Sequence, residues 1–401
     1  MKTSIFALGL AVALGGGAFA QEKTIKIGVL TDNSGLYADV AGPGATLAAK
    51  MAVEDSGLAA KGWKIEVISA DHQNKPDIAT SIARQWIDVE KVDVIVDAVN
   101  SGAGLAINAV TKEKNKALLA NGPASSELTN SQCSPNTVHW AYDTYMLSTG
   151  TGKAIVKNGG DTWFFLTADY TFGKTLEEET TAVITKNGGK VLGAVRAPIN
   201  TADFSSFLLQ AQASKAKIIG LANAGGDTTN SIKQAAEFGI VAGGQQLAAL
   251  LLFITDVNAL GLQVAQGLTF TASFYWDMND QTRAFSERFS KQMKNGNKPT
   301  MVQAGDYASV LHYLKAADAL GSVADGAKVI AKMKDMPTDD PLFGKGVIRV
   351  DGRKIHPVYL FEVKKPAESK YAWDYYKIKA TIPGEEAFRP LADSKCSLVT
   401  K

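Results

Sequence analysis

Two turns made mostly of small and hydroxyl residues follow neighbouring apolar segments of the chain. Asn100, Ser101 and Gly102 come after the segment 92–96, and Ala124, Ser125 and Ser126 come after 117–120. Both turns stand just before expected helices, where free backbone N–H groups and serine hydroxyls can bind an anion without arginine. Ordinary helix N-capping explains either turn taken alone. An anion site and simple capping therefore both stay open at this point.

A second group of turns supplies aromatic rings and a carboxylate. Tyr170 and Phe172 follow the segment 162–166, and Asn223, Ala224 and Asp227 follow 218–222. The rings could cover the apolar body of a ligand, and Asp227 could bond a polar tail. Packing between two lobes is the alternative explanation for the same residues.

The elements that would hold these turns alternate between strand and helix. Apolar, strand-like segments and amphipathic helical segments succeed one another from residue 24, and the pattern restarts at residue 162. Strands too apolar to face water predict parallel sheets covered by helices on both faces. In such sheets ligands bind outside the carboxyl ends of the strands, which is where the turns described above lie. Near the C-terminus, Asp351-Gly352 predicts a hairpin turn between strands 346–350 and 358–363.

The N-terminus has the pattern of a cleaved export signal. Lys2 provides a positive charge, residues 5–14 are apolar, and Ala18-Phe19-Ala20 forms an A-x-A cleavage site. A buried N-terminal helix is the alternative. Export predicts a soluble protein in an oxidising compartment, where the two cysteines, Cys133 and Cys396, can form one disulfide. Two unrelated buried thiols are the other interpretation.

The chain has few features of an enzyme or a nucleic-acid-binding protein. Gly150-Thr151-Gly152-Lys153 lacks the first glycine and the final hydroxyl residue of a phosphate-binding loop. No G-x-S-x-G sequence is present, and the four histidines have no metal-ligand spacing. The formal net charge is +2, without a basic stripe interleaved with aromatics. We therefore expect no catalysis, no cofactor, no metal site and no nucleic-acid partner.

Several short segments, in this order, resemble one family. They are Ile27-Gly28-Val29-Leu30 with Ser34-Gly35, then 97–101, 122–129 and 169–173. The whole mature chain resembles the periplasmic solute-binding proteins of ABC importers, of the branched-chain amino acid (Leu/Ile/Val) type. The resemblance implies an α/β fold of type I, with two Rossmann-like lobes joined by a hinge of three strands.

The resemblance also implies a division of the chain into lobes. A signal peptide at 1–20 would precede a first lobe of 24–141 plus 275–345. The second lobe would contain 142–274 plus 346–380, and 381–401 would form a C-terminal tail.

The roles of individual residues follow from the same resemblance. Ser101 would supply a hydroxyl to the ligand carboxylate, and Ala124 and Ser126 would supply amides and a second hydroxyl. Tyr170 or Phe172 would close over the ligand, and Asp256 would meet an ammonium group if the ligand were an amino acid. The full expected ligand-binding set is Tyr37, Asn100, Ser101, Gly102, Ala124, Ser125, Ser126, Tyr142, Tyr170, Phe172, Asn223, Ala224, Asp227, Phe253, Asp256 and Tyr275.

The ligand expected from this comparison is an aromatic or arylaliphatic carboxylate. Segments 137–143 and 274–277 look like those of family members that bind aromatic acids, and extra rings near the hinge suit a flat apolar body. Asn223-Ala224-Gly225 stands where amino-acid binders can carry a tyrosine-rich turn. A branched-chain amino acid or an amide is the alternative ligand.

The expected mechanism is hinge closure around the ligand, as in a Venus flytrap. The protein would act as a monomer in the periplasm and deliver its ligand to the membrane permease subunits of an ABC importer. A protein that senses a ligand and acts through a membrane receptor is the alternative of another class.

Overall fold

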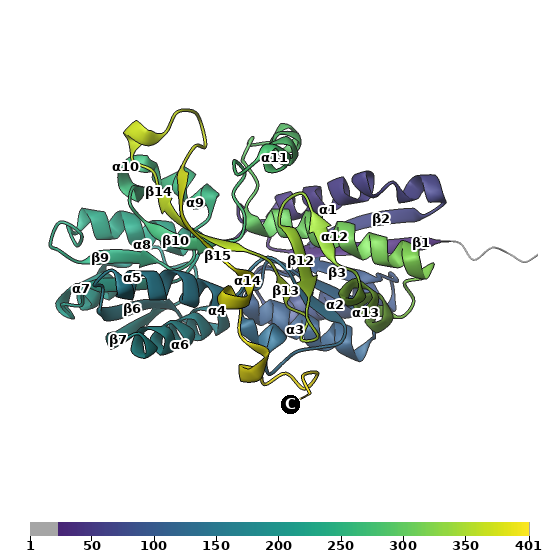
Figure 1. Ribbon diagram of the computed structural model, residues 1–401, viewed down its shortest axis with the longest axis horizontal. Coiled ribbons are helices and arrows are strands. Elements are labelled where there is room, and N and C mark those ends of the chain that lie inside the picture. The colour runs from purple at the N-terminus through teal and green to yellow at the C-terminus, as the bar shows by residue number, and fades with distance from the viewer. Residues whose placement is uncertain (1–22, 401) are drawn as a thin grey trace, which may run out of the picture.

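The computed structural model describes residues 23–400, which form two α/β lobes lying side by side (Figure 1). The predicted signal peptide at 1–20 lies outside the described residues. The predicted fold class is confirmed, because each lobe contains a parallel sheet with helices on both faces.

The first lobe is built on a five-stranded parallel sheet with the strand order β2-β1-β3-β4-β5. The strands are β1 (Thr24–Thr31), β2 (Lys64–Asp71), β3 (Val94–Asp97), β4 (Ala117–Ala120) and β5 (Thr137–His139). The helices are α1 (Gly42–Ser56), α2 (Pro76–Asp88), α3 (Ser101–Glu113), α11 (Asp280–Gln292), α12 (Met301–Leu320) and α13 (Gly326–Asp335).

Side chains along β1 point alternately to the two faces of this sheet, and both faces are covered by helices. Ile27 and Val29 belong to the core that includes α1 and α12, whereas Leu30 belongs to the core formed with α2 and α3. Gly28 leaves room for the ring of Trp86, which a Cβ atom would meet at 2.5 Å. Burial on both faces is what makes the strands continuously apolar.

The second lobe repeats the plan with a four-stranded parallel sheet in the order β7-β6-β8-β9. Its strands are β6 (Thr162–Ala168), β7 (Lys190–Ala197), β8 (Ile218–Ala222) and β9 (Gln246–Ala249). Its helices are α4 (Thr144–Leu147), α5 (Lys153–Lys157), α6 (Thr171–Lys186), α7 (Ser205–Ala213), α8 (Gly226–Glu237), α9 (Ile254–Leu260) and α10 (Leu262–Ala265). In both lobes the strand order reverses beside the first strand, and that is where open parallel sheets bind ligands.

Two antiparallel sheets complete the molecule. One contains β10 (Thr269–Ala272), β14 (Val358–Val363) and β15 (Tyr376–Ile382), and the other contains β11 (Thr338–Asp340), β12 (Gly344–Ile348) and β13 (Lys354–Ile355). The long strands β14 and β15 run from the second lobe toward the centre of the molecule (Figure 1). The remaining short elements are η1 (Leu58–Lys61), η2 (Ser126–Thr129), η3 (Ser148–Gly152), η4 (Pro366–Glu368), α14 (Gly384–Ala387) and η5 (Leu391–Asp393).

The hairpin prediction was right about the turn and wrong about the partner strand. Gly352 has a φ of 87° and donates its N–H to Arg349 O, so the turn is present. However, β12 pairs with the short strand β13, whereas β14 pairs with β10 and β15. The chain crosses between lobes after β13, which takes β14 away from the hairpin.

The contacts of Arg353 change the expected boundary between the lobes. The expected second lobe included 346–380, yet Arg353 pairs with His139 at the end of β5 in the first lobe. Its guanidinium is buried and donates to Tyr142 O at 3.0 Å and to Trp140 O in the first crossover segment. We therefore propose that the boundary follows residue 356.

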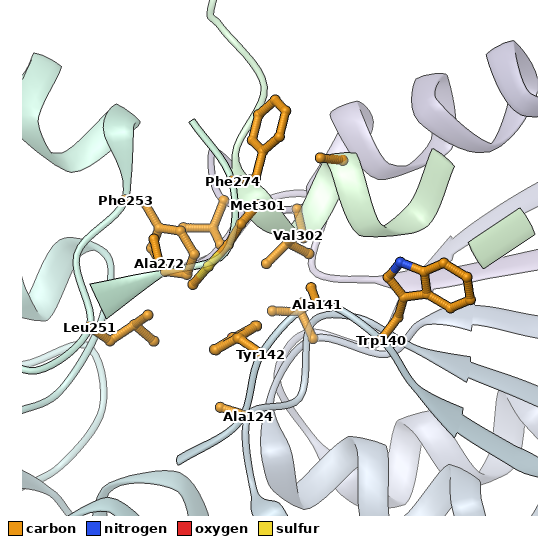
Figure 2. Packing of buried hydrophobic residues seen from close by; sticks show 14 of the residues in the cluster. Ala124, Trp140, Ala141, Tyr142, Leu251, Phe253, Ala272, Phe274, Met301 and Val302 are labelled. Atoms are coloured by element: carbon orange, nitrogen blue, oxygen red, sulfur yellow. The ribbon is translucent and has the colours of Figure 1, made fainter. Parts of the chain in front are cut away.

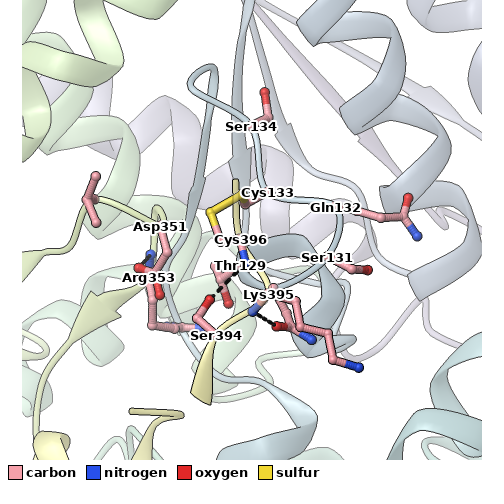
Figure 3. Close-up of a disulfide and its surroundings, with 12 residues drawn as sticks. Thr129, Ser131, Gln132, Cys133, Ser134, Asp351, Arg353, Ser394, Lys395 and Cys396 are labelled. Atoms are coloured by element: carbon pink, nitrogen blue, oxygen red, sulfur yellow. Dashed lines mark hydrogen bonds between the residues drawn. A yellow bond between two sulfur atoms is a disulfide. The ribbon is translucent and has the colours of Figure 1, made fainter. Parts of the chain in front are cut away.

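The C-terminal tail returns to the first lobe and is covalently attached there. Cys133 and Cys396 form a disulfide across 263 residues of sequence, as predicted. Next to it, the Lys395 N–H donates to Asn130 Oδ1 at 2.7 Å (Figure 3). Residues 383–396 thus cross the hinge and end on the first lobe.

Within residues 23–400, no helix has the length and apolar character needed to cross a membrane.

Candidate ligand-binding site

A cavity, called the ligand chamber here, lies where the two lobes meet. It is lined by segments that follow β1, β3 and β4 in the first lobe and β6, β8 and β9 in the second. The lining residues are Tyr37, Val40, Val99, Asn100, Ser101, Gly122, Ala124, Tyr142, Tyr170, Phe172, Ala224, Leu251 and Phe253. The carboxyl ends of both parallel sheets therefore face one shared space, as expected for this architecture.

One wall of the chamber is the N-terminus of α3. Ser101 is the first residue of this 13-residue helix, and Asn100 caps it by accepting the Ala103 N–H at 3.1 Å. The first backbone N–H groups of a helix have no acceptor within the helix, and they carry its positive partial charge. A negative headgroup placed beside Ser101 would be stabilised by both effects.

The Ser101 side chain also joins the two predicted turns. Its Oγ accepts the N–H of Ala124 at 3.2 Å and the N–H of Ser125 at 3.1 Å. The turn after β4 is thereby held against the start of α3. Ser101 can still donate its hydroxyl hydrogen to a ligand oxygen, because both contacts use only its acceptor capacity.

The loop leading into α3 has an unusual backbone. Asp97, Ala98 and Asn100 have φ values of 73°, 61° and 79°, although none is glycine. Such conformations cost of order 1–3 kcal/mol each and concentrate at ligand sites. Gly122 makes room for this loop, because a Cβ there would lie 2.5 Å from both Asp97 Oδ1 and Val99 Cα.

Two tyrosines close the chamber from opposite lobes. Tyr37 is positioned by Asp32, whose Oδ2 accepts the Tyr37 N–H at 2.9 Å. The Tyr37 hydroxyl lies 2.6 Å from the Tyr170 hydroxyl of the second lobe. Gly225 permits this approach, because it has a φ of 59° and a Cβ there would lie 2.9 Å from Leu36 O. The structure is therefore a closed form with the lobes in contact.

The remaining walls are apolar and aromatic. Tyr142 donates its hydroxyl to Gly122 O at 2.7 Å, which turns its ring toward the chamber. This ring meets Phe253 edge to face, with centroids 6.3 Å apart. Leu251, Phe253 and Tyr142 approach one another from facing segments (Figure 2). A flat ring would be covered on several sides here.

Several predicted residues lie outside the chamber lining. In the first lobe, the Ser126 N–H donates to Thr144 Oγ1 at 3.2 Å, and the Ser126 hydroxyl donates to Glu179 at 2.6 Å. The amide of Ser125 is used by Ser101, and Gly102 lies one residue further along α3. Ser126 is accordingly left out of the binding role proposed below.

The second-lobe residues outside the lining have structural contacts of their own. Asn223 bonds Ser231 and Thr228 of α8, and Asp256 caps α9 by accepting the Phe253 N–H at 2.9 Å. Burial raises the pKa of Asp256 to about 7. Tyr275 donates its hydroxyl to Trp373 O at 3.0 Å and lines a different cavity near the hinge.

Asp227 is the second residue of α8 and lies close to the two closing tyrosines. One carboxylate oxygen accepts the Asn200 N–H at 3.2 Å, and the other is buried without a hydrogen-bond partner. Burial raises the pKa of Asp227 to about 7. The electrostatic influence of Asp227 extends to Tyr37 and Tyr170, so its charge is felt at the chamber.

Sequence reasoning missed Val40, Val99, Gly122 and Leu251 as lining residues. Val99 and Gly122 belong to the family-like segments 97–101 and 122–129, and their place after β3 and β4 was the available signal. Val40 and Leu251 are apolar residues in apolar surroundings, which carry no pattern that separates a ligand wall from ordinary core.

Among residues 23–400 no cluster of histidine, cysteine, aspartate or glutamate has the arrangement needed to hold a metal ion.

The periplasmic binding protein family model matches residues 24–370, and the chain belongs to that family. It is a family of solute-binding proteins and not a family of enzymes.

Solved structures of periplasmic binding proteins are also similar to this chain. A periplasmic binding protein from Burkholderia mallei is 54% identical, with a TM-score of 0.91 and coverage of 94% of this chain and 100% of that chain. A branched-chain amino acid ABC transporter periplasmic ligand-binding protein from Burkholderia xenovorans LB400 is 41% identical, with a TM-score of 0.83 and the same coverage. An ABC transporter solute-binding protein from R. palustris in complex with 4-hydroxybenzoate shares the fold at 24% identity, with a TM-score of 0.81 and coverage of 90% and 97%.

Proposed function

We propose that this protein captures a small aromatic or arylaliphatic carboxylate in the ligand chamber and delivers it, in the periplasm, to the permease of an ABC importer. The observation that supports the proposal is the difference between the walls of the chamber. Ser101 and the N-terminus of α3 form one anion-binding wall, and the other walls are mainly aromatic and apolar.

The headgroup would be held without a cationic side chain. No lysine, arginine or histidine is among the chamber-lining residues of the described chain. Helix N–H groups and the Ser101 hydroxyl would supply charge-assisted hydrogen bonds to the carboxylate. The apolar body would then extend toward Tyr142, Phe172 and Phe253, which lie on the hinge and the second lobe.

The size of the chamber limits the ligand. Little free space remains in the closed form, because Tyr37 and Tyr170 meet across the chamber and Tyr142 packs against Phe253. A single ring with a carboxylate is of the appropriate class. The same fold accommodates 4-hydroxybenzoate in the R. palustris protein, which makes an aromatic acid compatible with this architecture.

Hinge closure would couple binding to delivery. The contact between Tyr37 and Tyr170 exists only when the lobes meet, so a ligand touching both lobes favours the closed form. The permease would then recognise the closed protein.

A branched-chain amino acid is the second candidate, and one observation favours it. The unpartnered oxygen of Asp227 is a buried acceptor near the chamber, and an ammonium group could supply its missing donor. The relative from B. xenovorans is described as a branched-chain amino acid transporter component.

A thermal-shift screen tests the proposal. Benzoates, phenylacetate, branched-chain amino acids, amides and short dicarboxylates are each added to the purified protein, and the melting temperature is measured. We expect the aromatic acids to raise it, because a ligand bound to the native state stabilises that state by mass action. A rise with amino acids and none with aromatic acids would replace the first candidate by the second.

The Ser101→Ala variant tests whether Ser101 binds the carboxylate. The substitution removes a donor to the ligand and leaves the amides of Ala124 and Ser125 unpaired, so we expect affinity to fall by about 1–3 kcal/mol in calorimetry. Ser134→Ala is the matched variant, because Ser134 Oγ also accepts a backbone N–H, from Asn136 at 3.1 Å. Equal affinity in the two variants would contradict the anion-binding role of Ser101.

A further inference from the structure

A second cavity, called the hinge chamber here, lies beyond the aromatic end of the ligand chamber. Its lining includes Phe274, Tyr275 and Trp276 from the second crossover segment and Thr300 and Met301 from the start of α12. The hydroxyl of Tyr275 is occupied by Trp373 O, so rings and aliphatic groups dominate the walls. Both cavities border on Phe253.

The partition between the chambers includes a short backbone segment, one hydrogen bond between the walls and one ring. Leu251 faces the ligand chamber and Leu252 faces the hinge chamber, so the backbone between them belongs to the wall. On the first lobe, Thr300 Oγ1 donates to Val40 O at 2.6 Å, and these residues line opposite chambers. Phe253 is the residue that lines both.

The Phe253 ring is held in place from several directions. Its backbone N–H is fixed by Asp256, its ring packs edge to face on Tyr142, and the side chain is only 3% exposed. In the close-up, Ala272 and Met301 lie beside it on the hinge side (Figure 2). The ring is therefore a fixed end wall of the ligand chamber in the closed form.

We propose that Phe253 determines the maximum length of the ligand by separating the ligand chamber from the hinge chamber. This inference rests on the proposed function, because it assumes that the carboxylate is held at the start of α3. An acid whose body ends at Phe253 is enclosed, and a longer acid meets the ring before the lobes can close. Truncation of the ring would join the chambers and admit the distal ring or methylene groups of a longer aromatic acid.

The experiment measures a length cut-off. Calorimetry is performed with benzoate, phenylacetate, 3-phenylpropanoate, 4-phenylbutanoate and 5-phenylpentanoate, and in parallel with straight-chain 2-amino acids of increasing length. For the native protein we expect affinity to fall by at least about tenfold beyond one length. In Phe253→Ala we expect that cut-off to move by two or more methylenes, with the longer acids gaining about tenfold.

Phe274→Ala is the matched control, because it removes the same ring from a residue that lines only the hinge chamber. We expect its cut-off to equal that of the native protein. Phe253→Leu, which removes less volume, provides a second test if the alanine variant is poorly folded, and its cut-off should lie between those of the native protein and Phe253→Ala.

The outcomes separate this inference from the proposed function. Folded Phe253 variants that bind short acids with an unchanged cut-off overturn the role of Phe253 and leave the function standing. Binding of the amino-acid series alone overturns the proposal of an aromatic ligand. The length cut-off measured within the amino-acid series then decides the role of Phe253. Binding of neither series overturns both.

Discussion

Asp227 is a buried carboxyl group whose protonation state affects the ligand chamber. Its pKa is raised to about 7 because burial disfavours the charged form, and backbone N–H groups offset this only in part. The raised pKa means that folding favours the neutral form. The contribution of Asp227 to the free energy of unfolding is thus present below its ordinary pKa of 3.8 and is lost as the pH rises through about 7.

We predict that the affinity for a carboxylate ligand falls as the pH rises from 6 to 8. Ionised Asp227 adds a negative charge near the chamber, so its protonated form binds an anion better, and a few-fold change is expected over this range. Calorimetry at several pH values should show the decline, and Asp227→Asn should reduce it, while Asp256 and Glu179, which titrate in the same range, remain in both proteins. An affinity that increases over the same range would indicate an ammonium-bearing ligand, because the ionised carboxylate attracts that group.

At the scale of elements, the C-terminal tail connects the two lobes beside the chamber. Arg389 on the tail forms an ion pair with Glu179 of α6 and donates to Ser126 Oγ at 3.3 Å. Its guanidinium also lies 4.8 Å from the ring centroid of Tyr145. Burial raises the pKa of Glu179 to about 7, even with the guanidinium beside it. Because Ser126 belongs to the first lobe and α6 to the second, this group of contacts links the two lobes in the closed form.

We predict that Arg389→Ala weakens ligand binding by about 3–10-fold without removing it. The loss of a few hydrogen bonds that link the lobes in the closed form, at about 0.5–1.5 kcal/mol each, should shift the population toward the open form. The dissociation constant is measured by calorimetry. Lys395→Ala changes an exposed side chain on the same tail and should bind as the native protein does. Equal losses in both variants would attribute the effect to the tail in general.

At the scale of the whole molecule, one covalent bond joins the end of the chain to the first lobe. The Cys133–Cys396 disulfide closes a loop that contains the whole second lobe and all three crossover segments. A cross-link of this span restricts the unfolded chain more than it restricts the folded one. The bond should therefore stabilise the complete two-lobe protein.

We predict that the double variant Cys133→Ser, Cys396→Ser lowers the free energy of unfolding by about 2–5 kcal/mol. Urea denaturation followed by circular dichroism measures the difference. Adding reductant to the native protein should reproduce the effect, and adding it to the double variant should change nothing. Coincident denaturation curves for native and variant protein would show that the cross-link is energetically neutral.

The sequence by itself was sufficient for the class of fold and for part of the site. The ends of apolar strands are visible as turns, and parallel strands bring their carboxyl ends to one edge, so Ser101, Ala124 and Tyr170 could be placed near a common space. The cysteine pair was predictable because an exported chain with two cysteines favours their pairing.

The tertiary structure decided which of these residues reach the chamber and which contact each other instead. Ser126 is turned toward Glu179, and Tyr275 lines a different cavity, because packing between the lobes orients their side chains. Val40 and Leu251 became chamber walls only when two sheets distant in sequence were brought together. Local patterns record the environment of a residue within its own element, whereas a site between lobes depends on contacts that no local pattern encodes.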